Sequence, residues 1–132
     1  MINPGLYIGN TDGMGRGVFS SVNLPTDLVV EISPVIVMSS EERKLLDKTL
    51  LHDYIFEWSA EKDNPMAIGC CMSFGYVAVY NHSYTSNCEH EMDFDEGVIR
   101  IKTIREIKAG EELFINYNGV WNNDKPLWFD AK

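Results

Sequence analysis

Short apolar runs that end at turn-forming residues constrain this chain more than any other feature of its sequence. The runs are rich in β-branched and aromatic residues and are bounded by Gly, Pro, Asn or Asp, which is typical of β-strands. They are too short and too scattered for one regular sandwich, so we expect a compact, strand-dominated domain. The predicted strands are residues 6–8, 17–20, 28–32, 35–38, 54–58, 76–79, 98–103 and 113–115.

One helix is expected to interrupt the strands. Ser39 is followed three residues later by Glu42, which is a capping box, and leucines then recur at helical spacing up to about Leu51. Turn residues occur at 63–65 and 95–97, and the second turn predicts a hairpin between residues 91–94 and 98–103. The fold class is therefore mainly β with one or two short helices.

Length and composition set the outer limits. With 132 residues the chain fits one domain, residues 1–132, which is large enough to bury roughly two thirds of its unfolded surface. Apolar residues make up 45% and charged residues 23%, as in ordinary globular proteins. The amino end shows no export signal and no run approaches a membrane span. We therefore expect an intracellular protein, cytoplasmic or nuclear, without membrane contact.

The cysteines indicate reduced thiols. Residues 70, 71 and 88 cannot all pair, and adjacent cysteines rarely bridge because the geometry is strained. A zinc site needs four ligands at short regular spacings, and His52, His82 and His90 do not supply that pattern. We expect no metal.

The net charge of -9 bears on partners. Direct nucleic-acid binding is disfavoured, because phosphate contacts need clustered Lys and Arg. An acidic surface either steers a basic peptide toward the protein or only maintains solubility. Charge alone leaves both interpretations open.

A glycine-rich turn precedes the second predicted strand. Gly13, Gly15 and Gly17 alternate with Met14 and Arg16, and glycine permits both positive φ and close approach of a ligand to the backbone. A plain turn before a strand is the simpler interpretation. The segment opens no helix and lacks the acidic partner of a dinucleotide fingerprint, which disfavours a Rossmann site.

Two further motifs indicate strand ends that deliver polar groups to a shared pocket. Asn81-His82-Ser83 directly follows an apolar run, and its side chains need partners if buried, because each unsatisfied group costs roughly 1–3 kcal/mol. A Ser-His hydrolase is disfavoured, since the two residues are adjacent and no Gly-x-Ser-x-Gly elbow occurs. Residues 111–117 end at Tyr117, whose hydroxyl either points into a cleft or belongs to an aromatic rim residue.

In this order, the three motifs resemble the SET domain, the fold of S-adenosylmethionine-dependent protein lysine methyltransferases. The resemblance covers about residues 6–121, with 122–132 as a C-terminal cap. It implies a β-fold of small sheets with a pseudoknot-like threading of the chain end through residues 81–88. Ser86 stands where the family commonly has proline, which weakens a local turn but touches no cofactor contact.

The resemblance also implies roles for individual residues. Tyr117 is the catalytic tyrosine, beside the target amine and the methyl group. The residues expected to contact S-adenosylmethionine, whose product is S-adenosylhomocysteine, are Met14, Gly15, Arg16, Gly17, Tyr54, Asn81, His82, Tyr117 and Trp121. The residues expected to line the substrate channel are Tyr54, Tyr80, Ile115 and Tyr117. Because the aliphatic Ile115 stands where the family often has an aromatic ring, we expect di- or trimethylation.

The function implied is transfer of a methyl group to a lysine in a basic, unstructured protein segment such as a histone tail. The alternative is a catalytically inactive SET-fold module that binds a lysine-containing tail. An apolar cluster at residues 127–129 either caps the peptide groove or forms a homodimer contact.

Overall fold

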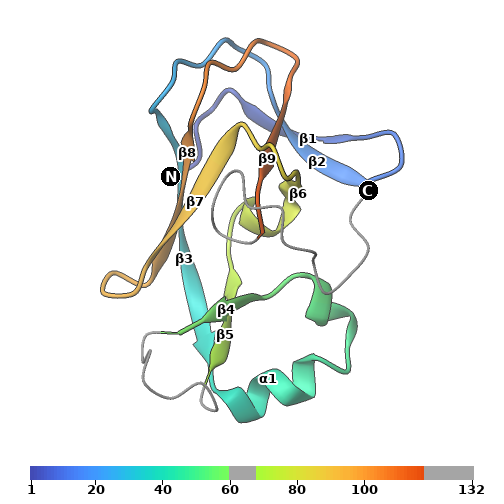
Figure 1. Cartoon of the computed structure of the whole chain (residues 1–132), viewed down its shortest axis with the longest axis vertical. Helices are drawn as coiled ribbons and strands as arrows, with labels where there is room; N and C mark the ends of the chain where they lie inside the picture. The colour runs from blue at the N-terminus through green and yellow to red at the C-terminus, as the bar shows by residue number, and fades with distance from the viewer. Residues whose placement is uncertain (60–67, 118–132) are drawn as a thin grey trace.

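A computed structural model describes residues 1–59 and 68–117 of the chain (Figure 1). Strands dominate this part of the molecule, together with one α-helix and two 3-10 turns. The elements are β1 (Leu6–Asn10), β2 (Arg16–Ser20), β3 (Val29–Met38), α1 (Ser40–Leu46), η1 (Leu50–Asp53), β4 (Phe56–Trp58), β5 (Gly69–Ser73), η3 (Val77–Val79), β6 (Asn81–His82), β7 (Cys88–Asp93), β8 (Val98–Thr103) and β9 (Glu112–Ile115).

The strands form two sheets, as expected for a fold of small sheets. One has the order β1-β2-β9-β6, and the other has the order β4-β5-β3-β8-β7. In Figure 1, β3 runs along one side of the molecule, with β7 and β8 beside its first half and β4, β5 and α1 near its end. The four-stranded sheet positions all three sequence motifs.

Strand β3 joins two predicted runs that a proline separates. Its first half pairs with β8 up to Pro34↔Val98, and its second half pairs with β5 from Val35↔Ser73 onward. Proline lacks an N–H donor, but it stands where the pairing partner changes, and its carbonyl accepts from the Phe74 N–H at 3.1 Å. The predicted break at residues 33–34 is therefore wrong, and the strand is continuous.

Residues 76–79 do not form the predicted strand. Gly75 turns the chain with a φ of 76°, and residues 77–79 then form the 3-10 turn η3, in which the Val79 N–H donates to the Tyr76 carbonyl at 2.8 Å. Strand β5 was not predicted either, because Gly-Cys-Cys-Met-Ser contains no β-branched or aromatic residue.

Two local predictions are confirmed. The capping box is present, since the Ser39 side chain accepts from the Glu42 N–H and the Glu42 carboxyl group accepts from the Ser39 N–H. The helix ends at Leu46, however, and η1 follows after a short turn. The hairpin of β7 and β8 turns at Gly97, which has a φ of 67°. The predicted turn at 63–65 lies outside the described residues.

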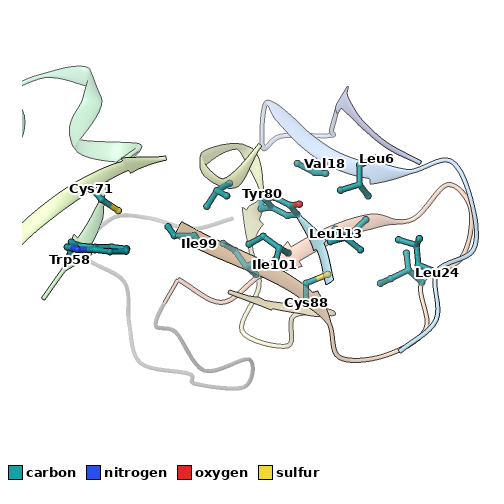
Figure 2. Close-up of a cluster of buried hydrophobic side chains, with 14 residues drawn as sticks. Leu6, Val18, Leu24, Trp58, Cys71, Tyr80, Cys88, Ile99, Ile101 and Leu113 are labelled. Carbon is teal, nitrogen blue, oxygen red and sulfur yellow. The ribbon is translucent and has the colours of Figure 1, made fainter. Parts of the chain in front are cut away.

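The core lies between the two sheets. Figure 2 shows Tyr80 among Val18, Ile101 and Leu113, with Trp58 and Cys71 farther away. The clustered side chains are Leu6, Val18, Leu24, Val30, Trp58, Cys71, Val77, Tyr80, Cys88, Ile99, Ile101, Ile107, Leu113 and Ile115.

All three cysteines are free and buried. Burial raises the pKa of the Cys71 and Cys88 thiols to about 12 in each case. Within residues 1–59 and 68–117, no helix has the length and hydropathy to cross a bilayer, and no group of three or more His, Cys, Asp or Glu side chains is arranged to hold a metal ion.

Candidate active site

Strand β9 brings the three motifs together. One edge of β9 pairs with β2, in the register Val18↔Leu113. Its other edge pairs in parallel with β6, in the register His82↔Ile115. The glycine-rich turn, the Asn-His pair and the late tyrosine therefore lie in or directly beside adjacent strands of one sheet.

Asn81 connects all three segments through its side chain. Its Nδ2 donates to the Arg16 carbonyl at 3.0 Å and to the Glu112 Oε2 at 2.8 Å. Gly17 lies beneath this contact, and a Cβ atom added there would come within 3.0 Å of both Glu112 Oε2 and Asn81 Nδ2. The absence of a side chain at Gly17 therefore allows the amide and the carboxyl group to meet over β2.

The glycine-rich turn has an open side. Gly13 and Gly15 have φ values of 88° and 69°, and a Cβ atom added at either position would meet no atom of the described residues within 4 Å. Hydrogen bonds within the turn stabilise it, since the Thr11 N–H and hydroxyl donate to the Gly15 carbonyl at 2.8 and 2.9 Å. The Met14 N–H donates to the Thr11 hydroxyl at 3.1 Å. This arrangement leaves room for a ligand against the backbone.

His82 has one satisfied and one unsatisfied ring nitrogen. Its Nδ1 accepts from the Tyr117 N–H at 3.0 Å, so in the neutral ring the proton is on Nε2. Burial lowers the pKa of His82, which keeps the imidazole neutral at pH 7. Among the residues that the structure describes, the buried Nε2 has no hydrogen-bond partner. A buried donor without a partner is unfavourable and calls for a polar acceptor.

The Tyr117 phenol is held by the segment that precedes Asn81. Its hydroxyl donates to the Tyr80 carbonyl at 2.5 Å, and its ring centroid lies 5.2 Å from that of His82 and 6.3 Å from that of Phe56. Burial first, and then the nearby Tyr54 and Glu112, raise the pKa of Tyr117 to about 12. The phenol therefore stays protonated at neutral pH and acts as a hydrogen-bonding group, not as a base.

After β6 ends, residues 83–87 turn back beside β9, from Ile115 toward Glu112. The Ser83 N–H donates to the Ile115 carbonyl at 3.0 Å. The Asn87 side chain binds the β9 backbone at two points. Its Nδ2 donates to the Glu112 carbonyl at 2.9 Å, and its Oδ1 accepts from the Phe114 N–H at 2.8 Å. The Ser86 hydroxyl donates to the Cys88 carbonyl at 2.8 Å, which orders the turn where the family commonly has proline.

The remaining predicted site residues differ in their surroundings. Tyr54 is 41% exposed, and it acts electrostatically on Tyr117. The Ile115 and Tyr80 side chains are completely buried in the core. The Tyr80 phenol donates to Glu31, so what this residue presents to Tyr117 is its main-chain carbonyl. Trp121 and the predicted cap at 122–132 lie outside the described residues.

Three residues near the site were not predicted. Phe56 packs edge-on against Tyr117, and His90 lies 5.8 Å from Phe56, measured between ring centroids. Glu31 is fully buried and bonds the Tyr80 hydroxyl. The signal for Glu31 was a lone acidic residue within an apolar strand, since such a charge needs buried partners.

Known proteins are similar to this chain in sequence and in fold. The SET domain profile matches residues 15–118. Over 131 residues the chain is 33% identical to the Schizosaccharomyces pombe protein named histone-lysine N-methyltransferase, H3 lysine-37 specific. That match covers 98% of this chain and 80% of the other protein.

Solved structures of other proteins have a similar fold. A Plasmodium falciparum protein assigned as a histone methyltransferase superposes with a TM-score of 0.66 at 26% identity, covering 91% of this chain and 98% of that chain. The Polycomb Repressive Complex 2 of Chaetomium thermophilum, solved in an autoinhibited conformation with S-adenosylmethionine, gives a TM-score of 0.67 at 19% identity. There the match covers 87% of this chain and 15% of that chain, and it concerns the fold alone.

Proposed function

The chain belongs to the SET-domain family, and from this premise we propose that it is a protein-lysine N-methyltransferase that uses S-adenosylmethionine. The observation that carries the proposal is the Tyr117 phenol. It is partly buried, protonated and hydrogen-bonded to the Tyr80 carbonyl, and it lies beside His82 just after β9, whose neighbour β2 follows the glycine-rich turn. We therefore propose Tyr117 as the tyrosine that lies beside the target amine and the methyl group.

The residues around the turn fit the proposed cofactor. The open backbone at Gly13 and Gly15 leaves space for a small polar ligand, and the buried His82 Nε2 offers a donor that has no partner within residues 1–59 and 68–117. We assign the cofactor contacts to Met14, Gly15, Arg16, Gly17, Asn81 and His82. The side chains of Asn81 and Glu112 keep the turn and β9 in register, so they hold this surface in one conformation.

S-adenosylmethionine, when bound, supplies a methyl group that is ready for displacement. The protein must then bind the lysine amine in its neutral form, which costs roughly 4–5 kcal/mol at pH 7 for an amine with a pKa near 10.4. An apolar channel lowers this cost, because burial disfavours the ammonium form. Phe56 and the Tyr117 ring provide apolar faces at this place.

Tyr117 orients the reacting groups in this proposal. Its hydrogen is donated to the Tyr80 carbonyl, so its oxygen accepts a hydrogen bond from the amine or a weak one from the polarised methyl. Because the pKa of Tyr117 is about 12, the phenol does not remove the proton from the ammonium. Its contribution is alignment, and alignment is worth several kcal/mol in an in-line transfer.

The proposed substrate is a basic, unstructured protein segment. The net charge of -9 favours long-range attraction of such a segment, and the S. pombe relative is named for a lysine of histone H3. We therefore propose a histone tail as the first substrate to test and the nucleus as the compartment. The capping and homodimer roles of residues 127–129 stay predictions.

The test is methyl transfer from labelled S-adenosylmethionine to histone H3 and other basic proteins, followed by mass spectrometry of the modified lysines. Wild type is expected to label a lysine and to add two or three methyl groups, whereas Tyr117→Phe is expected to lose at least tenfold in rate, about 1.4 kcal/mol of the barrier. Cofactor binding without any labelled lysine would instead favour the inactive binding module. Monomethyl product alone at long times would contradict the expectation drawn from Ile115.

A further inference from the structure

Glu31 is a buried acidic residue that the proposed reaction does not yet use. It lies in the middle of β3, and its exposed fraction is 0%. Three donors converge on its carboxyl group: the Tyr80 hydroxyl reaches Oε1 at 2.8 Å, and the Ser33 hydroxyl and the Tyr76 N–H reach Oε2 at 2.6 and 2.8 Å. A fully buried carboxyl group is tolerated only with such partners.

Two of these donors belong to the two ends of one short segment. Tyr76 is the N-cap residue of η3 and Tyr80 is its C-cap residue. Glu31 therefore fixes the segment 76–80 at both ends from a strand that is 45 to 49 residues away in sequence. Burial raises the pKa of Tyr80 well above its usual value, so its phenol stays a donor.

The last carbonyl of this segment holds the Tyr117 hydroxyl. The path runs from the Glu31 carboxyl group to the Tyr80 phenol, and from the Tyr80 carbonyl to the Tyr117 hydroxyl at 2.5 Å. We propose that Glu31 is a positioning residue, which fixes the Tyr80 carbonyl and through it the orientation of the Tyr117 phenol. This inference rests on the function proposed for Tyr117.

Strand β6 holds the chain that follows Tyr80, through the pairing Asn81↔Phe114, but within the segment 76–80 itself the anchors other than Glu31 are weak. The segment 76–80 is a single 3-10 turn whose internal main-chain bond is Val79 N–H to the Tyr76 carbonyl, and short 3-10 turns have poor hydrogen-bond geometry. Core packing of the Tyr80 ring holds the side chain but sets the carbonyl direction only loosely. The hydrogen bonds from Tyr76 and Tyr80 to Glu31 fix the rotation of the segment.

The experiment uses Tyr80→Phe, which keeps the packed ring and removes the hydroxyl that bonds Glu31. With the full-length chain, S-adenosylmethionine and histone H3, kcat is expected to fall about tenfold, equivalent to about 1.4 kcal/mol. Both KM values are expected to stay within about twofold, because alignment and not binding is lost. In a Tyr117→Phe background, the same substitution is expected to change kcat by less than about twofold, since the path ends at a hydroxyl that is no longer there.

Equal losses of kcat from Tyr80→Phe in both backgrounds would overturn the proposal. So would a fall in Tm with unchanged kcat, which would make the role structural only. Glu31→Gln is expected to act in the same direction, because one amide oxygen cannot serve three donors, and Tyr80→Phe carries the test if Glu31→Gln does not fold. Thr103→Val is the control, since it removes a buried hydroxyl that bonds Leu28 N–H and the Pro25 carbonyl, so it lowers stability without altering kcat.

A second readout separates this inference from the proposed function. The ¹³Cζ resonance of Tyr117 in ¹³C-tyrosine-labelled protein reports the hydrogen bond of its hydroxyl and needs no turnover. It is identified by its absence in Tyr117→Phe, and it is expected to shift in Tyr80→Phe and to stay in place in Thr103→Val. A wild type that labels no lysine would contradict the proposed function, whereas an unchanged resonance in Tyr80→Phe would overturn the role of Glu31.

Discussion

Replacing Gly75 with alanine tests how tightly the Glu31 cluster is packed. Gly75 has a φ of 76°, and a Cβ atom there would come within 3.0 Å of Glu31 Oε2 and Ser33 Oγ. Both oxygens take part in the same buried hydrogen-bond cluster, so neither can move without losing a partner. The substitution therefore combines backbone strain with a collision.

Gly97 supplies a matched comparison. Its φ is 67°, but a Cβ atom there would meet nothing within 4 Å in the part of the chain that the structure describes. Alanine at either position pays roughly 1–2 kcal/mol for the left-handed conformation. At Gly75 the collision adds about 1–3 kcal/mol, so Gly75→Ala is expected to cost about 2–5 kcal/mol in total.

Urea and thermal unfolding, followed by circular dichroism, measure both losses. At about 3–5 °C of Tm per kcal/mol for a domain of this size, Gly97→Ala is expected to lower Tm by roughly 3–10 °C, and Gly75→Ala by at least a further 3 °C or so. Losses of unfolding free energy that agree within about 0.5 kcal/mol for the two variants would refute the reasoning, because strain would then explain both.

Gly17→Ala is expected to displace the Glu112 carboxyl group from Asn81, at a cost of about 1.5–3 kcal/mol for a hydrogen bond to a charged group, and to weaken S-adenosylmethionine binding about tenfold in calorimetry. Unchanged affinity would show that this contact does not shape the site. His90 gives a pH dependence, because burial lowers its pKa from 6.5 to about 4. Between pH 4 and 6.5 the unfolded chain binds more protons at His90 than the folded protein does. His90 therefore leaves the free energy of unfolding unchanged above pH 6.5 and lowers it as the pH falls toward 4, by at most about 1.4 kcal/mol per pH unit. His90→Phe, which keeps a ring against Phe56, is expected to flatten this dependence in urea unfolding at pH 7, 6 and 5, and an equal slope in both proteins would contradict the assignment.

Local chemistry explains what the sequence predicted correctly. The Ser39–Glu42 capping box and the hairpin turn at Gly97 depend on residues within a few positions of each other, so the pattern contains the whole interaction. The three motifs were also recognisable locally, because each combines glycines or polar residues with a strand.

The errors come from interactions that are distant in sequence. Residues 76–79 have the composition of a strand, yet the positive φ of Gly75 and the hydrogen bonds to Glu31 convert them into a 3-10 turn. Periodicity cannot reveal a partner 45 residues away. The hydrogen bond from the Tyr80 hydroxyl to Glu31 was not predicted for the same reason, because the two residues are 49 positions apart.

The central place of β9 has a consequence for biosynthesis. Strand β6 has only two residues and pairs with one edge of β9, while β2 pairs with the other edge of β9. A nascent chain that has not yet released residues 112–117 from the ribosome therefore cannot assemble the proposed cofactor surface, however complete its first hundred or so residues are. Contacts between distant segments form slowly, so ligand binding should appear in one late step of folding.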